Sequence, residues 1–316
     1  MHVASPKVER RGLSATSYQV IAWLAFASLY IIIVTGALVR LTGSGLGCVD
    51  WPACNEQQFV DVSTPHAAIE QVNRLFTGVV AASVIAAMLA AFAVRPRDRR
   101  MIRLAILMVV GVVGQVVLGG IVVLTGLHPL SNMAHFLLSI VLMTWAYWLV
   151  APTLARDQYT GAPNPWRDLL TLRNWSLQRS NRLVTLGRVV IVLTAVAIVT
   201  GTVVTGSGPH AGDEASPRFD FAIRAVAKVH GASVIATVAV TLCLGLALRQ
   251  AGANRKLQNT FEAFLFLAVL QGGLGYLQYF TGVPVLLVAM HITLSVAVWL
   301  GALHLWQVIP RHPTPA

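Results

Sequence analysis

Charged side chains are scarce in this chain, and their scarcity excludes a soluble globular protein. Only 11% of its 316 residues are charged, whereas 56% are hydrophobic and the mean hydropathy is +0.70. The net charge is +11, but the Lys and Arg residues lie between apolar runs, where they determine membrane topology. An excess of basic residues in a chain without a polar surface argues against nucleic acid as a partner. Three cysteines are too few for a disulfide scaffold.

Apolar runs long enough to span a membrane as helices recur along the whole chain. A spanning helix needs about 20 apolar residues, and turn residues at 125–129 and 281–284 divide two uncharged runs that would otherwise be too long. The sequence therefore predicts an all-α membrane protein with eight transmembrane helices. Their predicted cores are residues 15–39, 75–94, 104–124, 130–155, 189–205, 229–248, 263–280 and 285–309.

The basic residues indicate on which side of the membrane each connection lies. With the N-terminus inside, most of the 23 Lys and Arg residues fall in the inner segments. The outer segments keep only Arg40, Arg74, Arg218, Arg224 and Lys228. We therefore expect a multi-pass protein of the bacterial plasma membrane with both termini in the cytoplasm.

The second half of the chain repeats the first. Gln115 precedes His135 by the same 20 residues that separate Gln271 from His291, and a Thr-Gly pair follows each glutamine at the same offset. A shared register of this kind predicts two similar bundles. It also predicts two similar sites, one in each bundle.

Each half is expected to form a four-helix bundle, one over residues 15–155 and the other over 189–309. A cytoplasmic linker at 156–188 joins them, and cytoplasmic tails cover 1–14 and 310–316. Four helices return the chain to the side on which it began. The two tandem bundles are therefore predicted to be parallel repeats related by a pseudo-two-fold axis along the membrane normal.

Three histidines lie inside predicted helices, near their outer ends. His135 and His291 are equivalent in the repeat, and His230 lies at a similar depth, where the first half has Asn73. Ionisable residues within membrane helices usually face a bundle interior or a cavity. Two imidazoles on facing helices can ligate a planar metal macrocycle from both sides, and axial ligation of heme iron fits this chemistry. For a lone histidine, a hydrogen bond across a helix interface is the alternative.

Glycines gather around these positions on the predicted helices. They either permit close helix packing or leave room for a flat cofactor. The glycines concerned are Gly111, Gly114, Gly119, Gly120, Gly272, Gly273 and Gly275.

Two of the cysteines, Cys48 and Cys54, lie six residues apart in the predicted first outer loop. Outside the membrane, in an oxidising compartment, they can form a small exposed disulfide. That bond would be either a structural staple or a redox-active pair. The spacing differs from Cys-x-x-Cys, which argues against a thioredoxin-like role.

Glu70 is the most informative acidic residue. It shares a helix face with Asn73 and Arg74. It therefore either forms an ion pair with Arg74 at the helix end or stands beside a cofactor, where a carboxylate can move protons or stabilise a cationic intermediate. Ala227 occupies the equivalent position in the second half. The catalysed reaction is therefore expected in the N-terminal half, and an electron-transfer cofactor is expected in the C-terminal half.

At these residues the chain resembles the heme A synthases, membrane enzymes that convert heme O to heme A for cytochrome oxidase. The likeness extends over nearly the whole chain, and its most specific part is the glycine-rich run at 35–48 that ends in the first loop cysteine. The other matching residues are Trp51, Pro52, Cys54, Glu70, Asn73, Arg74, His135, His230 and His291.

The resemblance implies two hemes. His230 and His291 would ligate heme b in the C-terminal half, and His135 would be an axial ligand of the substrate heme in the N-terminal half. It further implies that Glu70 is the catalytic carboxylate and that Cys48 and Cys54 form the loop disulfide.

Asn73 departs from the family pattern, because many members have His there and an amide is a poor ligand of iron. The substrate heme is then either five-coordinate through His135 or contacted by another residue. His66 lies on the same helix face but two turns nearer the outer surface, which makes it a weak substitute.

The implied reaction oxidises a methyl group of heme O to the formyl group of heme A, through successive hydroxylations. Electrons would pass to or from the C-terminal heme b. Cations near the outer heme level are candidates to bind heme propionates or to lie near the substrate heme. They are Arg40, Arg74, Arg224 and Lys228.

The resemblance also implies partners: heme O, a heme O synthase that supplies it, cytochrome oxidase assembly, and an unidentified electron donor or acceptor. A homo-oligomer is compatible with the sequence. The alternative function is a bis-heme membrane electron carrier, or a heme-handling protein that performs no methyl oxidation.

Overall fold

The computed structural model describes residues 12–154 and 182–309. Within them, eight helices are long and apolar enough to cross a membrane, which confirms the predicted membrane-spanning helices. Apart from one isolated bridge between Leu13 and Val94, the described residues form no β-structure. The helices are α1 (Ala15–Leu41), α2 (Pro65–Ala93), α3 (Arg99–Leu124), α4 (Pro129–Leu154), α6 (Arg182–Ser207), α7 (Ile223–Gln250), α8 (Arg255–Phe280) and α9 (Val285–Val308).

Several helices begin earlier than predicted. Helix α2 begins at Pro65 instead of residue 75, and α6 begins at Arg182, inside the predicted linker. An apolar run ends at the first charged residue, whereas backbone hydrogen bonds continue the helix past the apolar core. The rest of the predicted linker, residues 156–181, and most of both predicted tails lie outside the described residues.

Polar residues mark where four of the helices begin. Ser14, Thr64, Asp98 and Asn254 are the N-caps of α1, α2, α3 and α8, and each side chain accepts a hydrogen bond from a backbone N–H of the first turn. Pro65 follows its cap, at a position where the missing N–H has no helical partner.

The two turn clusters seen in the sequence have the same structure. Gly126 (φ 61°) and Leu127 (φ 63°) adopt the left-handed region between α3 and α4, as Gly282 (φ 82°) and Val283 (φ 61°) do between α8 and α9. In each turn the non-glycine residue donates its N–H to a carbonyl of the preceding helix, at 2.8 and 2.7 Å. These bonds stabilise a conformation that leucine and valine rarely adopt.

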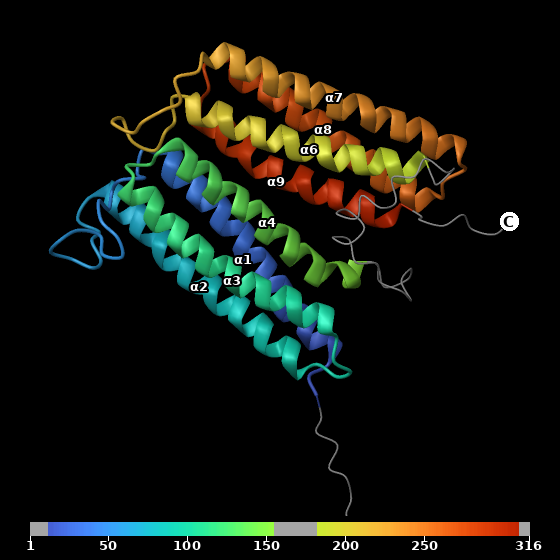
Figure 1. Cartoon of the computed structure of the whole chain (residues 1–316), viewed down its shortest axis with the longest axis horizontal. Coiled ribbons are helices and arrows are strands. Elements are labelled where there is room, and N and C mark those ends of the chain that lie inside the picture. The colour runs from blue at the N-terminus through green and yellow to red at the C-terminus, as the bar shows by residue number, and fades with distance from the viewer. Residues whose placement is uncertain (1–11, 155–181, 310–316) are drawn as a thin grey trace, which may run out of the picture.

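The helices form two groups of four, α1–α4 and α6–α9, which lie side by side (Figure 1). Hydrogen bonds join them. Tyr30 on α1 donates to the Thr293 carbonyl on α9 at 2.9 Å, and the Trp299 indole on α9 donates to Thr144 Oγ1 on α4 at 2.8 Å. A symmetry axis relating the groups and the sidedness of the membrane stay predictions.

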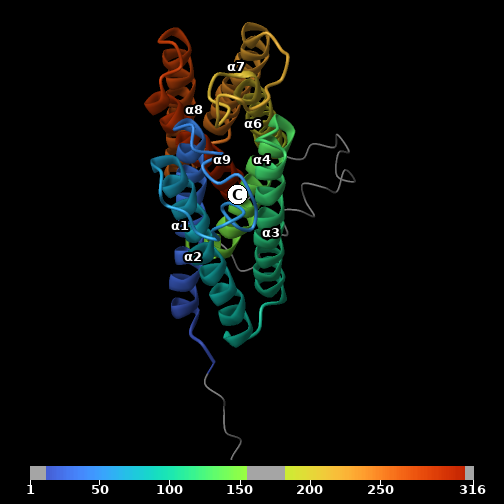
Figure 2. The same ribbon diagram turned by 90° about the vertical axis from the view of Figure 1, so that its left-hand side faces the viewer.

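The two long loops, residues 42–64 and 208–222, lie at one end of the molecule, on the left in Figure 1 and facing the viewer in Figure 2. We call this the loop end. A backbone hydrogen bond of 2.9 Å from Gly45 to the Gly212 carbonyl connects the two loops.

Candidate functional site

His230 on α7 and His291 on α9 face each other inside the C-terminal group. Their ring centres are 6.4 Å apart, and the ring planes are inclined at 84°. A metal–imidazole bond is about 2.1 Å long and the ring centre lies about 1.2 Å behind the bonding nitrogen, so two imidazoles on opposite sides of one metal have centres about 6.5 Å apart. The observed spacing therefore fits one heme iron between the two rings.

Neighbouring helices orient these two imidazoles. Thr200 Oγ1 on α6 lies 3.2 Å from His230 Nδ1. On α8, Gln271 Nε2 lies 3.2 Å from His291 Nε2 and donates to the His291 carbonyl at 3.0 Å. His291 Nδ1 is buried and has no hydrogen-bond partner among the described residues. A buried nitrogen of this kind fits a site that a bound group completes.

Glycines on the preceding helices leave room for both rings. A Cβ atom at Gly201 of α6 would lie 3.1 Å from Cε1 of His230, and a Cβ atom at Gly275 of α8 would lie 3.0 Å from Cε1 of His291. Any larger residue would press against the imidazole. At these two positions, glycine therefore makes space for the imidazole itself.

The N-terminal group has the matching arrangement at Asn73 on α2 and His135 on α4. Thr35 Oγ1 donates to Asn73 Oδ1 at 2.8 Å, and Gln115 Nε2 donates to the His135 carbonyl at 3.1 Å. His135 Nδ1 is buried without a hydrogen-bond partner in the described part of the chain. Gly119 on α3 faces this ring, with its hypothetical Cβ 3.5 Å from Cε1.

Other glycines of the predicted set serve packing. A Cβ at Gly111 would collide with the Leu142 side chain, and one at Gly120 would lie 2.8 Å from the Trp51 ring. Gly273 differs from both, because a Cβ there would have no neighbour within 4 Å. Close packing thus explains Gly111 and Gly120, while the interpretation that the glycines leave room for a flat cofactor stays a prediction.

His66 lies at the loop end, where its Nδ1 is 2.9 Å from Ser44 Oγ. Its side chain is exposed and lines a cavity of about 650 Å³, whose wall also includes Asp213 and Glu214. The contact with Ser44 thus connects the His66 side chain to the first long loop.

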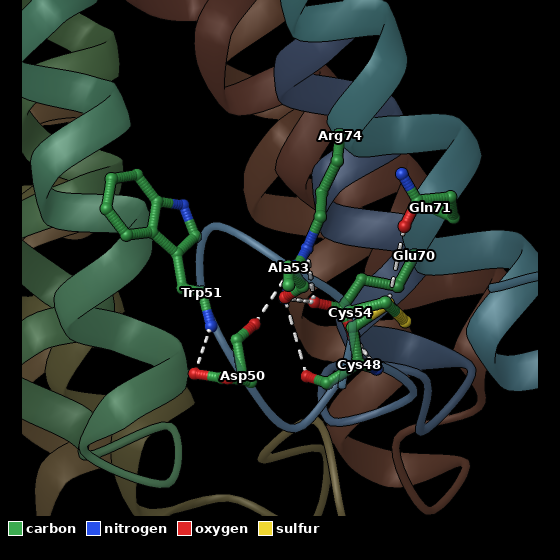
Figure 3. Close-up of polar contacts among 8 residues, drawn as sticks. All are labelled: Cys48, Asp50, Trp51, Ala53, Cys54, Glu70, Gln71 and Arg74. Carbon is green, nitrogen blue, oxygen red and sulfur yellow. Dashed lines mark hydrogen bonds and ion pairs between the residues drawn. A yellow bond between two sulfur atoms is a disulfide. The ribbon is translucent and has the colours of Figure 1, made fainter. Parts of the chain in front are cut away.

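Glu70 lies in the second turn of α2 and is only 5% exposed. Its Oε1 accepts hydrogen bonds from Nε and Nη2 of Arg74, at 2.9 and 2.6 Å, so the ion pair given as one alternative for Glu70 is present. Its Oε2 accepts the backbone N–H of Cys48 at 2.8 Å. The carboxylate therefore stabilises the first long loop as well as the helix end (Figure 3).

Arg74 binds the same loop through three backbone carbonyls. Its guanidinium donates to the carbonyl oxygens of Asp50, Ala53 and Cys48, at 3.0, 3.2 and 3.4 Å (Figure 3). One arginine thus supplies the hydrogen bonds that several turn carbonyls need away from water. The sequence alone did not reveal this role, because backbone acceptors leave no trace in residue identities.

Cys48 and Cys54 form the implied disulfide. The prediction that this bond is exposed is wrong, because both cysteines are completely buried. Hydrogen bonds with Glu70 and Arg74 hold the loop against α2, and Gln71 Oε1 lies 3.6 Å from Cys48 Sγ.

Asp61 lies near the end of the same loop. Hydrogen bonds from Ser63 and then Asn55 lower the pKa of its carboxyl.

The other candidate cations lie in two kinds of surroundings. Arg40 belongs to α1 but binds backbone carbonyls of the other helix group. Its Nε donates to the His210 carbonyl at 2.8 Å, and its Nη2 donates to the Thr205 carbonyl at 3.0 Å. Arg224 and Lys228 are exposed on the first two turns of α7. Arg40 therefore helps to join the halves, whereas the two α7 cations face outward.

A sequence model of the COX15-CtaA family, described as cytochrome oxidase assembly protein, matches residues 19–303. The chain belongs to this family. The match includes both helix groups, Glu70 and the three histidines at 135, 230 and 291.

Individual relatives align with a shorter part of the chain. Proteins named heme A synthase from Listeria welshimeri and Bacillus pumilus are 34% and 35% identical to it, over 121 and 115 residues. The heme A synthase of Geobacillus thermodenitrificans is 32% identical over 115 residues. These alignments cover 36% to 37% of this chain, which spans 39%, 37% and 36% of the three relatives' own lengths.

Proposed function

We propose that this protein is a heme A synthase, which oxidises a methyl group of heme O to the formyl group of heme A for cytochrome oxidase. The family match over 19–303 and the relatives named heme A synthase support this function. The single observation that carries it is the His230–His291 pair, whose 6.4 Å spacing suits bis-histidine ligation of a heme iron.

In this proposal, His230 and His291 hold heme b, which supplies one-electron redox chemistry when bound. Thr200 and Gln271 keep the two imidazoles in orientation, as residues behind metal ligands generally do. Arg224 and Lys228 are the exposed cations nearest in sequence to His230, and we assign them to the heme propionates.

The substrate heme O binds in the N-terminal group with His135 as its axial ligand. Asn73 is the residue equivalent to His230, and its amide oxygen already accepts a hydrogen bond from the Thr35 hydroxyl. The weaker ligation at Asn73 favours release, which suits a heme that must leave as product. We also propose that Arg40, at the end of α1, and Arg74, on α2, lie near this substrate heme.

Glu70 is the carboxylate that moves protons or stabilises positive charge during methyl oxidation. It precedes Asn73 by three residues and so lies one turn nearer the loop end on the same face of α2. Arg74 and the Cys48 N–H hold its two oxygens in defined positions. A preorganised carboxylate is what such a role requires.

The charge distribution supports a location in the bacterial plasma membrane, with both termini in the cytoplasm and the loop end outside. The proposed partners are a heme O synthase that delivers the substrate, cytochrome oxidase assembly as the destination of heme A, and an electron donor or acceptor. A second copy of the chain is a further proposed partner.

One observation favours the alternative of a bis-heme electron carrier. Both oxygens of Glu70 are engaged in contacts that stabilise the loop, so the carboxylate has a structural role without any methyl oxidation. Coexpression with a source of heme O, followed by identification of the extracted hemes, separates the two functions. We expect heme A only in cells that carry this gene; a heme-loaded protein in cells that contain only heme O would establish the carrier instead.

A valine at Gly275 is expected to displace the His291 imidazole and to remove most of the heme b. The new Cβ would lie 3.0 Å from the ring, and its methyl groups would add to the clash. The matched control is Gly273→Val on the same helix, where a Cβ meets no atom within 4 Å. Reduced-minus-oxidised absorbance per protein measures the difference; equal heme content in the two variants would show that Gly275 does not determine ring position.

A further inference from the structure

A second cavity lies between the two helix groups, far from the loop end. It has a volume of about 360 Å³, and its wall includes Trp23 and Phe26 of α1, Tyr147 of α4, Leu267 of α8, and Ala297 and His304 of α9. Along α9, His304 is thirteen residues beyond His291, which corresponds to about 20 Å. This cavity is therefore separate from the proposed heme b ligands.

The cavity opens on the side of the molecule that would face lipid. Trp23 is 38% exposed and packs edge-on against Phe26, with ring centroids 5.3 Å apart. Aromatic and aliphatic side chains make up most of the wall. Such a site suits a flat apolar ring that enters from the bilayer, and its volume is within the range of about 300 to 1,000 Å³ of small-molecule sites.

Two polar side chains, Tyr147 and His304, stand in this otherwise apolar wall and are hydrogen-bonded to each other. Tyr147 donates its hydroxyl proton to Gln307 Oε1 at 2.8 Å, so its 2.9 Å bond with His304 requires the proton to be on His304 Nδ1. Nε2 is then the acceptor of the neutral imidazole, and no described residue donates to it. His304, which lines the cavity, thus supplies a hydrogen-bond acceptor in mostly apolar surroundings.

We propose that this cavity binds the headgroup of an isoprenoid quinol. A quinol hydroxyl donates to His304 Nε2, the flat ring lies against Phe26 and the aliphatic wall, and the isoprenoid tail leaves past Trp23 into the lipid. A lipid acyl chain would leave the imidazole nitrogen without a partner, which is unfavourable in a low-dielectric environment. The binding does not depend on the proposed heme A synthase activity.

The test uses the full-length, heme-loaded protein in lipid nanodiscs, reduced with dithionite beforehand so that calorimetry reports binding alone. Two probes are titrated: 2-methyl-1,4-naphthohydroquinone and its 1,4-dimethyl ether, which has the same ring but no hydroxyl donor. We expect the wild type to bind the hydroquinone about fivefold to tenfold more tightly, the effect of one neutral hydrogen bond.

His304→Phe is expected to remove this preference, and Ala297→Phe, which fills the cavity, to abolish binding of both probes. His128→Phe is the matched control, because this histidine lies in the turn before α4, at the loop end, and should leave both affinities unchanged. An unchanged heme spectrum shows that each variant is folded. Three results would overturn the proposal. They are equal affinity of the wild type for the two probes, a preference for the hydroquinone that survives His304→Phe, and a cavity in which only phospholipid binds.

Discussion

Cells that carry Glu70→Gln are expected to lose heme A almost completely, while the purified variant keeps its heme b. Glutamine preserves the shape of the side chain but neither accepts a proton nor carries a negative charge. Acid–base catalysis by one positioned group contributes about 100-fold to 10,000-fold, so heme A should fall by about two orders of magnitude or more. Heme extraction from cells supplied with heme O measures this loss.

The loop contacts of Glu70 require a second measurement on the same variant. Glutamine can still accept hydrogen bonds through its amide oxygen, either from Arg74 or from the Cys48 N–H. The loop should therefore stay folded over the buried Cys48–Cys54 disulfide. The rate at which a mild water-soluble reductant opens this disulfide reports on the loop.

Arg74→Gln is the companion variant, because it removes the donor to three loop carbonyls and leaves the carboxylate in place. We expect faster reduction of the disulfide with a smaller loss of heme A than in Glu70→Gln. If both variants expose the disulfide and lose heme A to the same extent, Glu70 acts by stabilising the loop, and the catalytic assignment is wrong.

Replacing either His230 or His291 by Ala is expected to remove the bis-histidine heme b signal, with at least about a tenfold loss of bound heme b. The double variant should be hardly worse than either single one, because both residues bind one iron and their effects are not additive. The measurement is the reduced-minus-oxidised spectrum of purified protein, together with heme content per chain.

His135→Ala is the matched control for this pair, since it occupies the equivalent position in the N-terminal group and has the same glutamine-to-carbonyl hydrogen bond. It should keep the heme b spectrum and lose only the substrate heme. A wild-type spectrum in the His230→Ala/His291→Ala double variant would show that these residues do not bind heme. Electron transfer would then need another site.

Much of the architecture could be predicted because it depends on local chemistry. Uncharged runs of membrane-spanning length and the Thr-Gly turns predicted the eight helices and their breaks. The Glu70–Arg74 pair followed from helix periodicity, because residues four apart share a face. Helix starts were predicted less well, because charged residues near the starts of α2 and α7, such as Arg74 and Lys228, ended the predicted apolar cores before the helices themselves end.

The environment of the loop could not be predicted in the same way. Composition suggested an exposed disulfide, yet both cysteines are completely buried because the Glu70 carboxylate and the Arg74 guanidinium bind loop backbone groups. The Tyr147–His304–Gln307 cluster was missed as well, because its members come from helices far apart in the chain. An aromatic residue and a histidine in separate apolar runs give no signal of contact.

The amino-acid sequence by itself determined the membrane class, the number of spanning helices, the repeated positions of the histidines and the pairing of Glu70 with Arg74. Each of these depends on hydropathy or on spacing within one helix, which the order of residues specifies directly. Only the tertiary structure decided the 6.4 Å spacing of the His230 and His291 rings, the burial of the disulfide and the cavity beside His304. These features depend on how separate helices and loops pack, and that packing is determined by the sum of many weak contacts instead of any local pattern.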